Sequence, residues 1–343
     1  MKWGEKGKTL FIMPGGIGNM VLLLPAIKAY ALAYPAAFIG VLALEKAPLD
    51  LVKNQEYVKE TILIDKKTRA SVLGMIGFIL TMRSKKYDIA IAASGVNPVK
   101  AGALAVLSGI GARAGECWNC LSALYNRTVR SSGLLHEADR NMAIVGLFGA
   151  GGEPLPVLDI SPGDNERVTE LLDRAGVEED DVIIGMHPGS GKEQGEKKRW
   201  PLEKFKELAE IISRKTDAKV VVLGGPKEEG FGEEIVASGG HKVLNFINKL
   251  EMPLSAAMIK RCRAFVSNDS GLGHIAAAVG TPLVSIFGPT DPEKTRPRGA
   301  VKVVRKVMPC QPCFRKGAIK CEGSDCLTSL GAQEVFKELA VFL

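Results

Sequence analysis

The chain of 343 residues is too long for one small domain, and roughly 150 residues per domain predicts two. A composition of 46% hydrophobic and 6% aromatic residues with 38 glycines excludes a disordered chain and favours α/β layers. Residues 1–160 carry 18 basic and 12 acidic side chains, so most of the net charge of +7 lies in the first half and points to an anionic partner. An ordinary soluble surface with an excess of lysines explains this charge as well. Because the basic residues lack the interleaved aromatic residues typical of nucleic-acid binding, no nucleic-acid partner is expected.

In the first half, short apolar runs alternate with amphipathic stretches. Strands are predicted over 9–13, 37–44, 60–65 and 88–94, with helical patterns after each and a closing helix over 140–150. Such units predict a parallel sheet covered by helices on both faces. The longest apolar stretch is interrupted by Pro25, Lys28 and Pro35, and the N-terminus lacks the apolar segment of a signal peptide, so a cytoplasmic protein is expected.

A segment rich in Gly, Pro and acidic residues, 151–166, predicts the domain linker. A second alternation follows, with strands expected over 181–188, 218–225, 264–269 and 282–288 and helices over 201–216, 228–238, 253–262 and 270–280. We therefore expect an N-terminal domain over 1–155, a C-terminal domain over 165–330 and a final helix over 331–343 that packs back on the N-terminal domain. Two doubly wound sheets of this kind bind ligands beyond the carboxyl ends of their strands.

Two turns in the second half carry the chemistry of an anion site. HPGSG (187–191) directly follows an apolar strand, and its glycines let backbone N–H groups approach a phosphate, with the Ser190 hydroxyl as a further donor. NDSGLGH (268–274) supplies cap oxygens and glycines at the start of a helix, where free N–H groups and the helix dipole favour an anion. Either turn alone is equally consistent with an ordinary strand-to-helix connection.

Taken together, the motifs resemble glycosyltransferase family 9, which includes the ADP-heptose–lipopolysaccharide heptosyltransferases. The resemblance covers nearly the whole chain and rests on GGIGN…LPAI (15–27), HEADRNMAIVGLFG (136–149), HPGSG…KKRWP (187–201), VVLGGPKEE (221–229), NDSGLGHIAAAVGTPLVSIFGPT (268–290) and the cysteine segment CQPC (310–313). It implies a GT-B architecture, in which two Rossmann-like domains face an interdomain cleft. It also implies an inverting transfer without a catalytic metal or other cofactor, with the nucleotide-sugar donor on the second domain and the acceptor on the first.

The resemblance also implies roles for individual residues. Ser190 and Lys198 would contact the donor diphosphate, and a fixed cation there stabilises the charge that develops on the leaving group. Glu228 would accept hydrogen bonds from ribose hydroxyls, although Glu229 or the Gly224–Gly225 backbone could serve instead. The other wall of the donor site would consist of Asp269, Ser270, Gly271, Gly273 and His274, and the acceptor side of Gly16, Gly18 and Asn19.

Asn19 departs from the family pattern. In heptosyltransferases an Asp at this position serves as the general base for the acceptor hydroxyl, and a carboxamide cannot take up a proton at neutral pH. Three explanations remain open. Another carboxylate such as Asp88 or Glu137 acts as the base, or the proton leaves through water or a substrate group while Asn19 orients the hydroxyl, or the protein binds sugar nucleotide without efficient transfer.

The expected function is therefore transfer of a sugar, heptose from ADP-heptose above others, to a lipopolysaccharide-core or related acidic glycolipid, with peripheral contact at the inner membrane surface. A non-catalytic relative that binds sugar nucleotide or envelope glycolipid and a GT-B-like sugar-nucleotide epimerase are the alternatives. An NAD-dependent oxidoreductase is disfavoured because Val21 stands where the third glycine of the dinucleotide fingerprint is due.

Four of the seven cysteines follow the spacing Cys310-x2-Cys313-x7-Cys321-x4-Cys326. This spacing could close around a tetrahedral structural zinc ion, and thiols in a cytoplasmic protein more often bind metal than form disulfides. An iron–sulfur site and free or disulfide-bonded cysteines in a surface loop are the alternatives. Cys117 and Cys120 form a separate pair to which no function is assigned.

Overall fold

The computed structural model describes residues 7–13, 15–117, 124–130, 135–191, 195–315, 318–319, 321 and 323–343. Cys120 lies outside these residues. The chain divides into two compact units, Met1–Leu158 and Asp159–Leu343. The division lies within the segment 151–166 that the composition marks as a linker.

The described part of the first unit contains a six-stranded, fully parallel sheet. Its strand order is β3-β2-β1-β4-β5-β6, and the bounds are β1 Lys8–Ile12, β2 Phe38–Ala43, β3 Glu60–Leu63, β4 Ile89–Ala92, β5 Ala112–Cys117 and β6 Arg127–Arg130. The order reverses at β1, which pairs with β2 on one side and β4 on the other. This is the doubly wound topology that the sequence predicts. Two further strands, β5 and β6, extend the sheet and are not predicted by the sequence.

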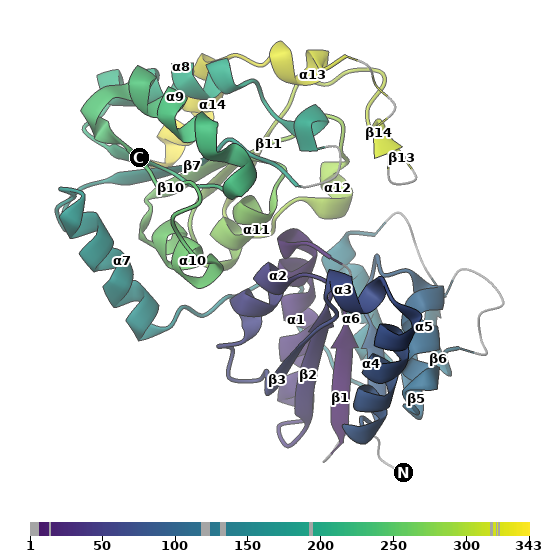
Figure 1. Cartoon of the computed structure of the whole chain (residues 1–343). Coiled ribbons are helices and arrows are strands. Elements are labelled where there is room, and N and C mark those ends of the chain that lie inside the picture. Colours follow the sequence, from purple (N-terminus) through teal and green to yellow (C-terminus); the bar gives the residue numbers. More distant parts are fainter. Residues whose placement is uncertain are drawn as a thin grey trace. The chain divides into compact units, whose positions relative to one another are not determined.

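Helices cover the sheet of the first unit on both faces (Figure 1). Their bounds are α1 Ile17–Ala33, α2 Lys46–Val52, α3 Lys66–Arg69, α4 Val72–Ser84, α5 Pro98–Leu107 and α6 Glu137–Gly146. Helix α1 packs on α6, and α4 packs on α5. Helix α6 begins three residues earlier than expected, because His136 caps it by accepting a hydrogen bond from the Ala138 N–H and acidic residues occupy its first turn.

The described residues of the second unit form another six-stranded parallel sheet, with the order β12-β11-β10-β7-β8-β9. The bounds are β7 Ile183–His187, β8 Lys219–Val222, β9 Val243–Asn245, β10 Ala264–Asn268, β11 Leu283–Ile286 and β12 Val301–Val304. Central strands β7 and β10 are buried along their whole length, as continuous apolar runs in a parallel sheet should be. The two outermost strands, β9 and β12, are absent from the sequence prediction.

The helices of the second unit confirm the expected alternation. The main ones are α7 Pro162–Arg174, α8 Leu202–Lys215, α9 Glu229–Gly239, α10 Met252–Arg261, α11 Gly271–Ala278 and α14 Ala332–Leu339, with short helices α12 Pro292–Thr295 and α13 Asp325–Thr328. A small hairpin joins β13 Phe314–Arg315 to β14 Ala318–Ile319. Within the described residues, no helix has both the length and the apolar character needed to cross a bilayer.

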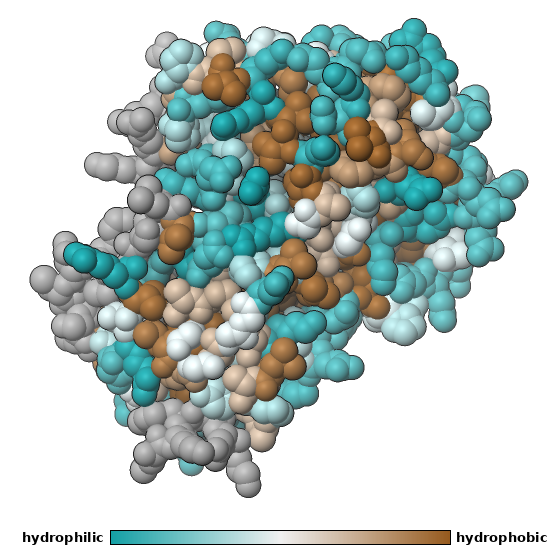
Figure 2. All heavy atoms as spheres, turned by 180° about the vertical axis from the view of Figure 1, so that it is seen from behind, coloured by the Kyte–Doolittle hydropathy of each residue, from teal (hydrophilic) through white to brown (hydrophobic). Residues whose placement is uncertain are grey.

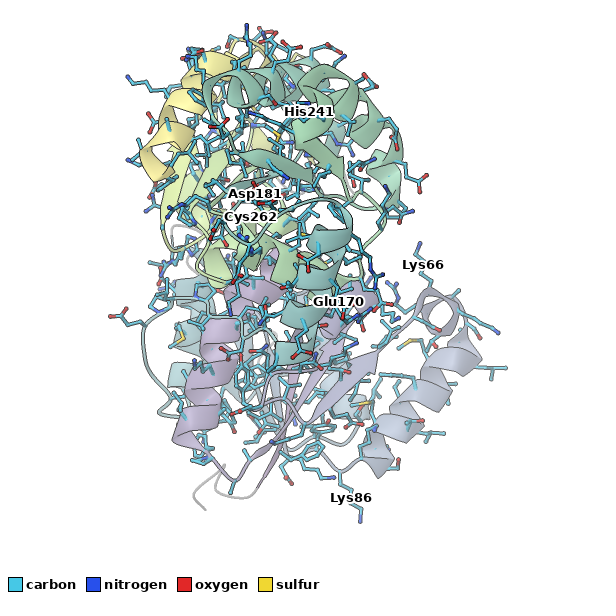
Figure 3. All side chains as sticks on the ribbon, turned by 90° about the vertical axis from the view of Figure 1, so that its left-hand side faces the viewer. Lys66, Lys86, Glu170, Asp181, His241 and Cys262 are labelled. Atoms are coloured by element: carbon cyan, nitrogen blue, oxygen red, sulfur yellow. The ribbon has the colours of Figure 1, made fainter. Side chains whose placement is uncertain are left out.

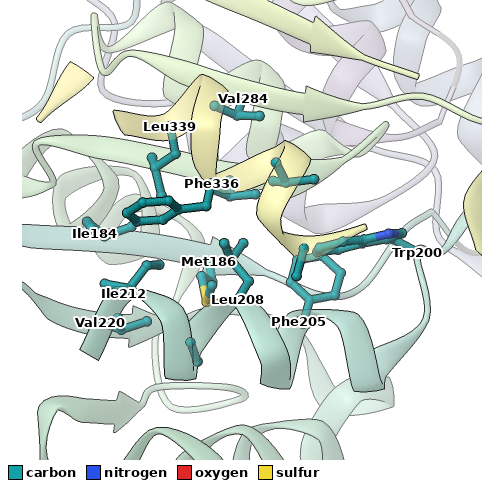
Figure 4. Packing of buried hydrophobic residues seen from close by; sticks show 14 of the residues in the cluster. Ile184, Met186, Trp200, Phe205, Leu208, Ile212, Val220, Val284, Phe336 and Leu339 are labelled. Atoms are coloured by element: carbon teal, nitrogen blue, oxygen red, sulfur yellow. The ribbon is translucent and has the colours of Figure 1, made fainter. Parts of the chain in front are cut away.

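The last helix completes the core of the second unit. Phe336 and Leu339 of α14 pack in one buried cluster with Phe205 of α8 and Ile184 of β7 (Figure 4). The Trp200 indole N–H donates to the Leu330 carbonyl at 2.9 Å, which ties the approach to α14 to the start of α8. The apolar face of α14 is buried among α8 and the sheet of its own unit, and the expectation that this helix packs back on the N-terminal domain stays a prediction.

Candidate active site

In the first unit, the glycine turn lies between β1 and α1. Gly16 precedes α1 with φ of 96°, a left-handed conformation that glycine adopts without the strain of a side chain. A Cβ at Gly16 would also lie 3.4 Å from Asn19 Oδ1. Gly18 and Asn19 fall in the first turn of α1, at the carboxyl end of the central strand, where ligands of doubly wound sheets bind.

Asn19 has a carboxylate as its neighbour. Its side-chain Nδ2 donates to Glu137 Oε1 at 2.9 Å, although the two residues are 118 positions apart in the sequence. Glu137 is the first residue of α6 and remains partly exposed. Burial raises the pKa of the Glu137 carboxyl to about 7, against the opposing effects of Arg140 and of the hydrogen bond from Asn19. The carboxyl beside Asn19 therefore titrates near neutral pH.

Two hydrogen bonds one turn further along α6 hold the Asn19–Glu137 pair in place. The buried Asn141 side chain donates to the Leu22 carbonyl of α1 at 3.2 Å and accepts from the Ser94 N–H at 2.8 Å. Because residues four apart share one face of a helix, Glu137 and Asn141 both face α1. The packing of α6 on α1 thus positions the carboxylate. Asp88, the other candidate base, lies before β4 at the opposite end of the sheet and accepts from the Lys8 N–H at 2.8 Å.

A cavity of about 140 Å³ opens in the first unit beyond the ends of β4 and β5. Its lining includes Tyr125 and the ion pair between Arg140 and Glu116. The Arg140 guanidinium donates twice to this carboxylate, at 2.7 and 2.5 Å, and electrostatically it also acts on Glu137. The cavity therefore combines a mainly apolar lining with one charged pair, Arg140 and Glu116.

In the second unit, the HPGSG turn is held by one buried side chain. Asn268, the last residue of β10, donates from Nδ2 to the carbonyls of Pro188 and Gly189 at 2.8 and 3.0 Å and accepts from the Trp200 N–H at 2.8 Å. A Cβ at Gly189 would approach the Glu228 carboxylate and the His187 ring to 2.6 and 2.7 Å, so only glycine fits there. Asn268 thereby joins the two anion-site turns across neighbouring strands.

Lys198 is held in place by an acidic partner. Its Nζ lies 3.4 Å from Asp269 Oδ2 and 5.1 Å from the centre of the Phe314 ring. The Thr290 hydroxyl donates to the same Asp269 oxygen at 2.8 Å. The Lys198 and Asp269 side chains are only 20% and 10% exposed, so this cation is fixed and partly desolvated. Such a cation interacts more strongly with a phosphate than a freely moving surface lysine does.

Ser270 caps α11 and contacts a neutral histidine. Its hydroxyl lies 2.9 Å from His187 Nδ1, and burial lowers the pKa of His187 to about 3. Gly271 and Gly273 belong to the first turn of α11, and a Cβ at Gly273 would lie only 2.4 Å from the Ser267 hydroxyl. His274 is buried in the same turn. The first turn of α11 therefore packs closely beside the HPGSG turn.

Glu228 and Ser190 are engaged within the protein. Glu228 Oε2 accepts from the Gly225 N–H at 2.7 Å, and Oε1 lies 3.6 Å from Arg199 Nη2. The Ser190 hydroxyl donates to the Gly195 carbonyl at 2.8 Å. These contacts stabilise the loops that carry both residues. Their roles in donor binding remain predictions.

The structure brings the predicted donor-side residues together around the carboxyl ends of β7 and β10. Sequence reasoning missed two of their partners, Arg199 and Thr290, and interpreted Asn268 only as a source of helix-cap oxygens. Thr290 closely follows the apolar run of β11, and a search of every predicted strand end for polar side chains could have found it. No local feature of the sequence distinguishes Arg199 from the neighbouring Lys198.

The described thiols of the cysteine segment form hydrogen bonds with nearby backbone carbonyls, and the zinc site stays a prediction. The Cys313 thiol donates to the Cys310 carbonyl at 3.2 Å, and the Cys321 thiol to the Gly323 carbonyl at 3.1 Å. Burial raises the pKa of Cys313 to about 11, together with the neighbouring thiols of Cys310, Cys321 and Cys326. Among the described residues, no group of three or more His, Cys, Asp and Glu side chains is arranged to hold a metal ion.

Two doubly wound parallel sheets with polar residues at their strand ends define a class of nucleotide-dependent α/β proteins. Comparison with known proteins narrows the class. Residues 75–321 match glycosyltransferase family 9 (heptosyltransferase). The chain is 26% identical to lipopolysaccharide heptosyltransferase 2 of Escherichia coli strain K12 over 98% of both chains.

Solved structures of similar proteins agree with this family match. The structure of E. coli ADP-heptose LPS heptosyltransferase II aligns with a TM-score of 0.78 and 26% identity over 98% of each chain. A family 9 glycosyl transferase from Veillonella parvula shares the fold with a TM-score of 0.86 at 21% identity, covering 98% of this chain and 97% of that one. The chain belongs to glycosyltransferase family 9, as its motifs suggested, and the GT-B-like fold is confirmed.

Proposed function

We propose that this protein transfers heptose from ADP-heptose to a lipopolysaccharide-core or related acidic glycolipid acceptor, with inversion at the anomeric carbon and without a catalytic metal. The observation that carries the proposal is the similarity over 98% of both chains to lipopolysaccharide heptosyltransferase 2. The fixed Lys198 in the second unit supports it, because metal-independent transfer needs a protein cation at the departing diphosphate.

On the donor side, the diphosphate binds at the HPGSG turn and the start of α11. Backbone N–H groups there donate to phosphate oxygens, and the Ser190 hydroxyl joins them by rotating away from the Gly195 carbonyl to which it donates in this structure. Lys198 balances the charge that grows as the glycosidic bond breaks. Asp269 does not contact the anion itself. It holds Lys198 and Thr290 in position, so this carboxylate supports the cation instead of repelling the phosphate.

On the acceptor side, Glu137 is the general base and Asn19 positions it. The acceptor oxygen bonds to the anomeric carbon as the bond from that carbon to the diphosphate oxygen breaks. The acceptor proton passes to Glu137, and the bonding electrons leave with ADP. A base with a pKa near the working pH is the most effective, and Glu137 has this property whereas Asn19 cannot accept a proton.

A transfer assay tests the function directly. The wild-type protein is incubated with ADP-heptose and an acidic heptose-deficient lipopolysaccharide core, and the product is followed by mass. We expect the acceptor to gain one heptose, with one ADP released for each. Turnover of nucleotide sugar without acceptor would favour an epimerase or hydrolase, and binding of ADP-heptose without any turnover would leave only the non-catalytic alternative.

A thermal-shift panel tests the donor base. Because a ligand that binds only the folded state raises the melting temperature in proportion to the logarithm of its concentration over Kd, the four nucleotides ADP, UDP, GDP and CDP can be ranked at one concentration. We expect ADP to give the largest shift. A larger shift with UDP would redirect the proposal to another nucleotide sugar.

The zinc hypothesis has its own test. The Cys313 and Cys321 thiols donate to backbone carbonyls, and no group of three or more potential metal ligands among the described residues is arranged to hold an ion. We therefore expect elemental analysis of protein purified without added metal to find substoichiometric zinc. A full equivalent, lost together with thermal stability on chelation, would restore the zinc site that the spacing suggested.

A further inference from the structure

Helix α4 is apolar on the side that faces solvent as well as on the side that faces the core. Met75, Phe78 and Met82 pack into the core of the first unit. On the other side, four large apolar side chains are exposed, namely Val72 at 78%, Leu73 at 79%, Ile76 at 48% and Leu80 at 60%. Hydrophobic side chains reach the surface at several places (Figure 2), but α4 collects these four within nine residues of one helix. A solvated helix normally carries polar residues there.

Basic residues frame this apolar face at both ends. Lys66, Lys67 and Arg69 of α3 precede it and are exposed, and Arg83, Lys85 and Lys86 follow it, of which Lys85 is paired with Glu60. The 21 residues from 66 to 86 contain no acidic residue. Figure 3 shows Lys66 and Lys86 extending away from the ribbon at opposite ends of this segment. We call residues 66–86 the α3–α4 surface.

We propose that the α3–α4 surface docks the protein on a membrane of anionic phospholipids. The apolar side chains of α4 enter the boundary between headgroups and acyl chains, and the flanking cations bind the negatively charged headgroups. The 13 residues of α4 fall short of the roughly 20 needed to span a bilayer, so the helix lies in the interface. Long basic side chains can reach the headgroups while the helix sinks below them.

The charge distribution favours an anionic membrane over a second copy of the chain as the partner of the α3–α4 surface. A two-fold self-interface through the α3–α4 surface would bring two clusters of basic residues together without acidic partners from the same segment. An anionic bilayer complements both the charge and the apolar face. The inference goes beyond the proposed function by assigning the membrane contact to one surface, and it agrees with a lipid-anchored acceptor.

Co-sedimentation with vesicles tests the proposal. The full chain is mixed with vesicles of phosphatidylcholine alone or with phosphatidylglycerol added, in the absence of donor and acceptor. We expect binding only to the anionic vesicles, weakened by salt. The double variant Leu73→Ser/Ile76→Ser should lower the partition coefficient at least about tenfold, because it removes two apolar side chains from the interface. The matched control Leu32→Ser/Val341→Ser changes side chains that are 72% and 65% exposed elsewhere and should bind as wild type does.

The electrostatic part is tested separately. Lys66→Gln/Lys67→Gln/Arg69→Gln should lower binding roughly tenfold to a hundredfold and reduce its dependence on salt. The control Arg174→Gln/Lys260→Gln/Lys302→Gln removes the same charge from exposed positions of the second unit and should leave binding intact. Circular dichroism and transfer to a water-soluble acceptor fragment verify that each variant folds.

Two outcomes would overturn the docking surface. One is equal loss of binding in the test and control variants. The other is a dimer in solution that Leu73→Ser/Ile76→Ser dissociates, which would make α4 a self-interface. Vesicle binding requires neither donor nor acceptor, so a protein that docks but transfers no heptose would refute the proposed function alone, and a protein that transfers to a soluble acceptor without docking would refute this inference alone.

Discussion

Lys198→Ala should lower kcat for heptose transfer by about 10²- to 10³-fold, the usual cost of removing one preorganised group that stabilises transition-state charge. The Lys198 ammonium lies 3.4 Å from Asp269, which the Thr290 hydroxyl fixes in turn, so the cation is positioned before the donor arrives. Because the leaving diphosphate gains charge only as the bond breaks, the loss should fall mainly on kcat and less on KM. Steady-state kinetics with ADP-heptose measures both.

The neighbouring lysine provides a matched control. Lys197 belongs to the same short helix, but its ammonium donates to the carbonyls of Ile319 and Cys321 instead of pairing with Asp269. Lys197→Ala should therefore leave kcat within about twofold of wild type, since surface substitutions away from a site change little. Equal losses in the two variants would show that the loop is merely destabilised and that Lys198 has no special part in the chemistry.

Glu137→Gln should lower kcat by about 10²- to 10⁴-fold, the range that positioned proton transfer supplies. The amide oxygen of Gln can still accept the hydrogen bond from Asn19, so the contact between α1 and α6 survives while the capacity to take up a proton is lost. Near-normal KM for the acceptor with a collapsed kcat would identify a base. Unchanged kcat would indicate that water or a substrate group accepts the acceptor proton.

The pH profile gives an independent check on the same residue. Burial raises the pKa of Glu137 to about 7, so the carboxylate form needed by a base is lost as the pH falls through 7. Log kcat of the wild-type protein should rise with a slope of one up to about pH 7 and then level off. Glu137→Gln should lose this limb, and the control Asp88→Asn, at the opposite end of the sheet, should keep it.

Asn19→Asp tests why the family's base is missing. A carboxylate at position 19 would lie within hydrogen-bond distance of Glu137, and two carboxylates at that separation share one proton near neutral pH. The limb should therefore move to higher pH, and transfer at pH 7 should not exceed that of wild type. A large gain in rate at pH 7 would instead mean that Glu137 is a poor substitute for a base at position 19.

The sequence by itself determined the two doubly wound sheets, the linker and the two glycine-containing turns that follow β7 and β10. These features are local. Strands β7 and β10 are continuous apolar runs because both faces of a parallel sheet are covered. The turns after them carry glycines and cap residues that can be recognised within a few positions of the sequence. It did not show β5, whose ARAGEC sequence includes Arg, Glu and Gly, or the short outer strands β9 and β12, because pairing with a neighbour and not propensity makes them strands.

Only the tertiary structure decided which carboxylate stands beside Asn19. Sequence reasoning could name Glu137 and Asp88 as candidates but had no spacing argument between them, since residues 118 positions apart meet through the packing of α6 on α1. The same limit applies to Thr290 and Asn268, which act across neighbouring strands, and to the outward apolar face of α4. Local periodicity reports which residues can be buried together, but the partner that covers or approaches them is chosen by contacts between elements distant in the chain.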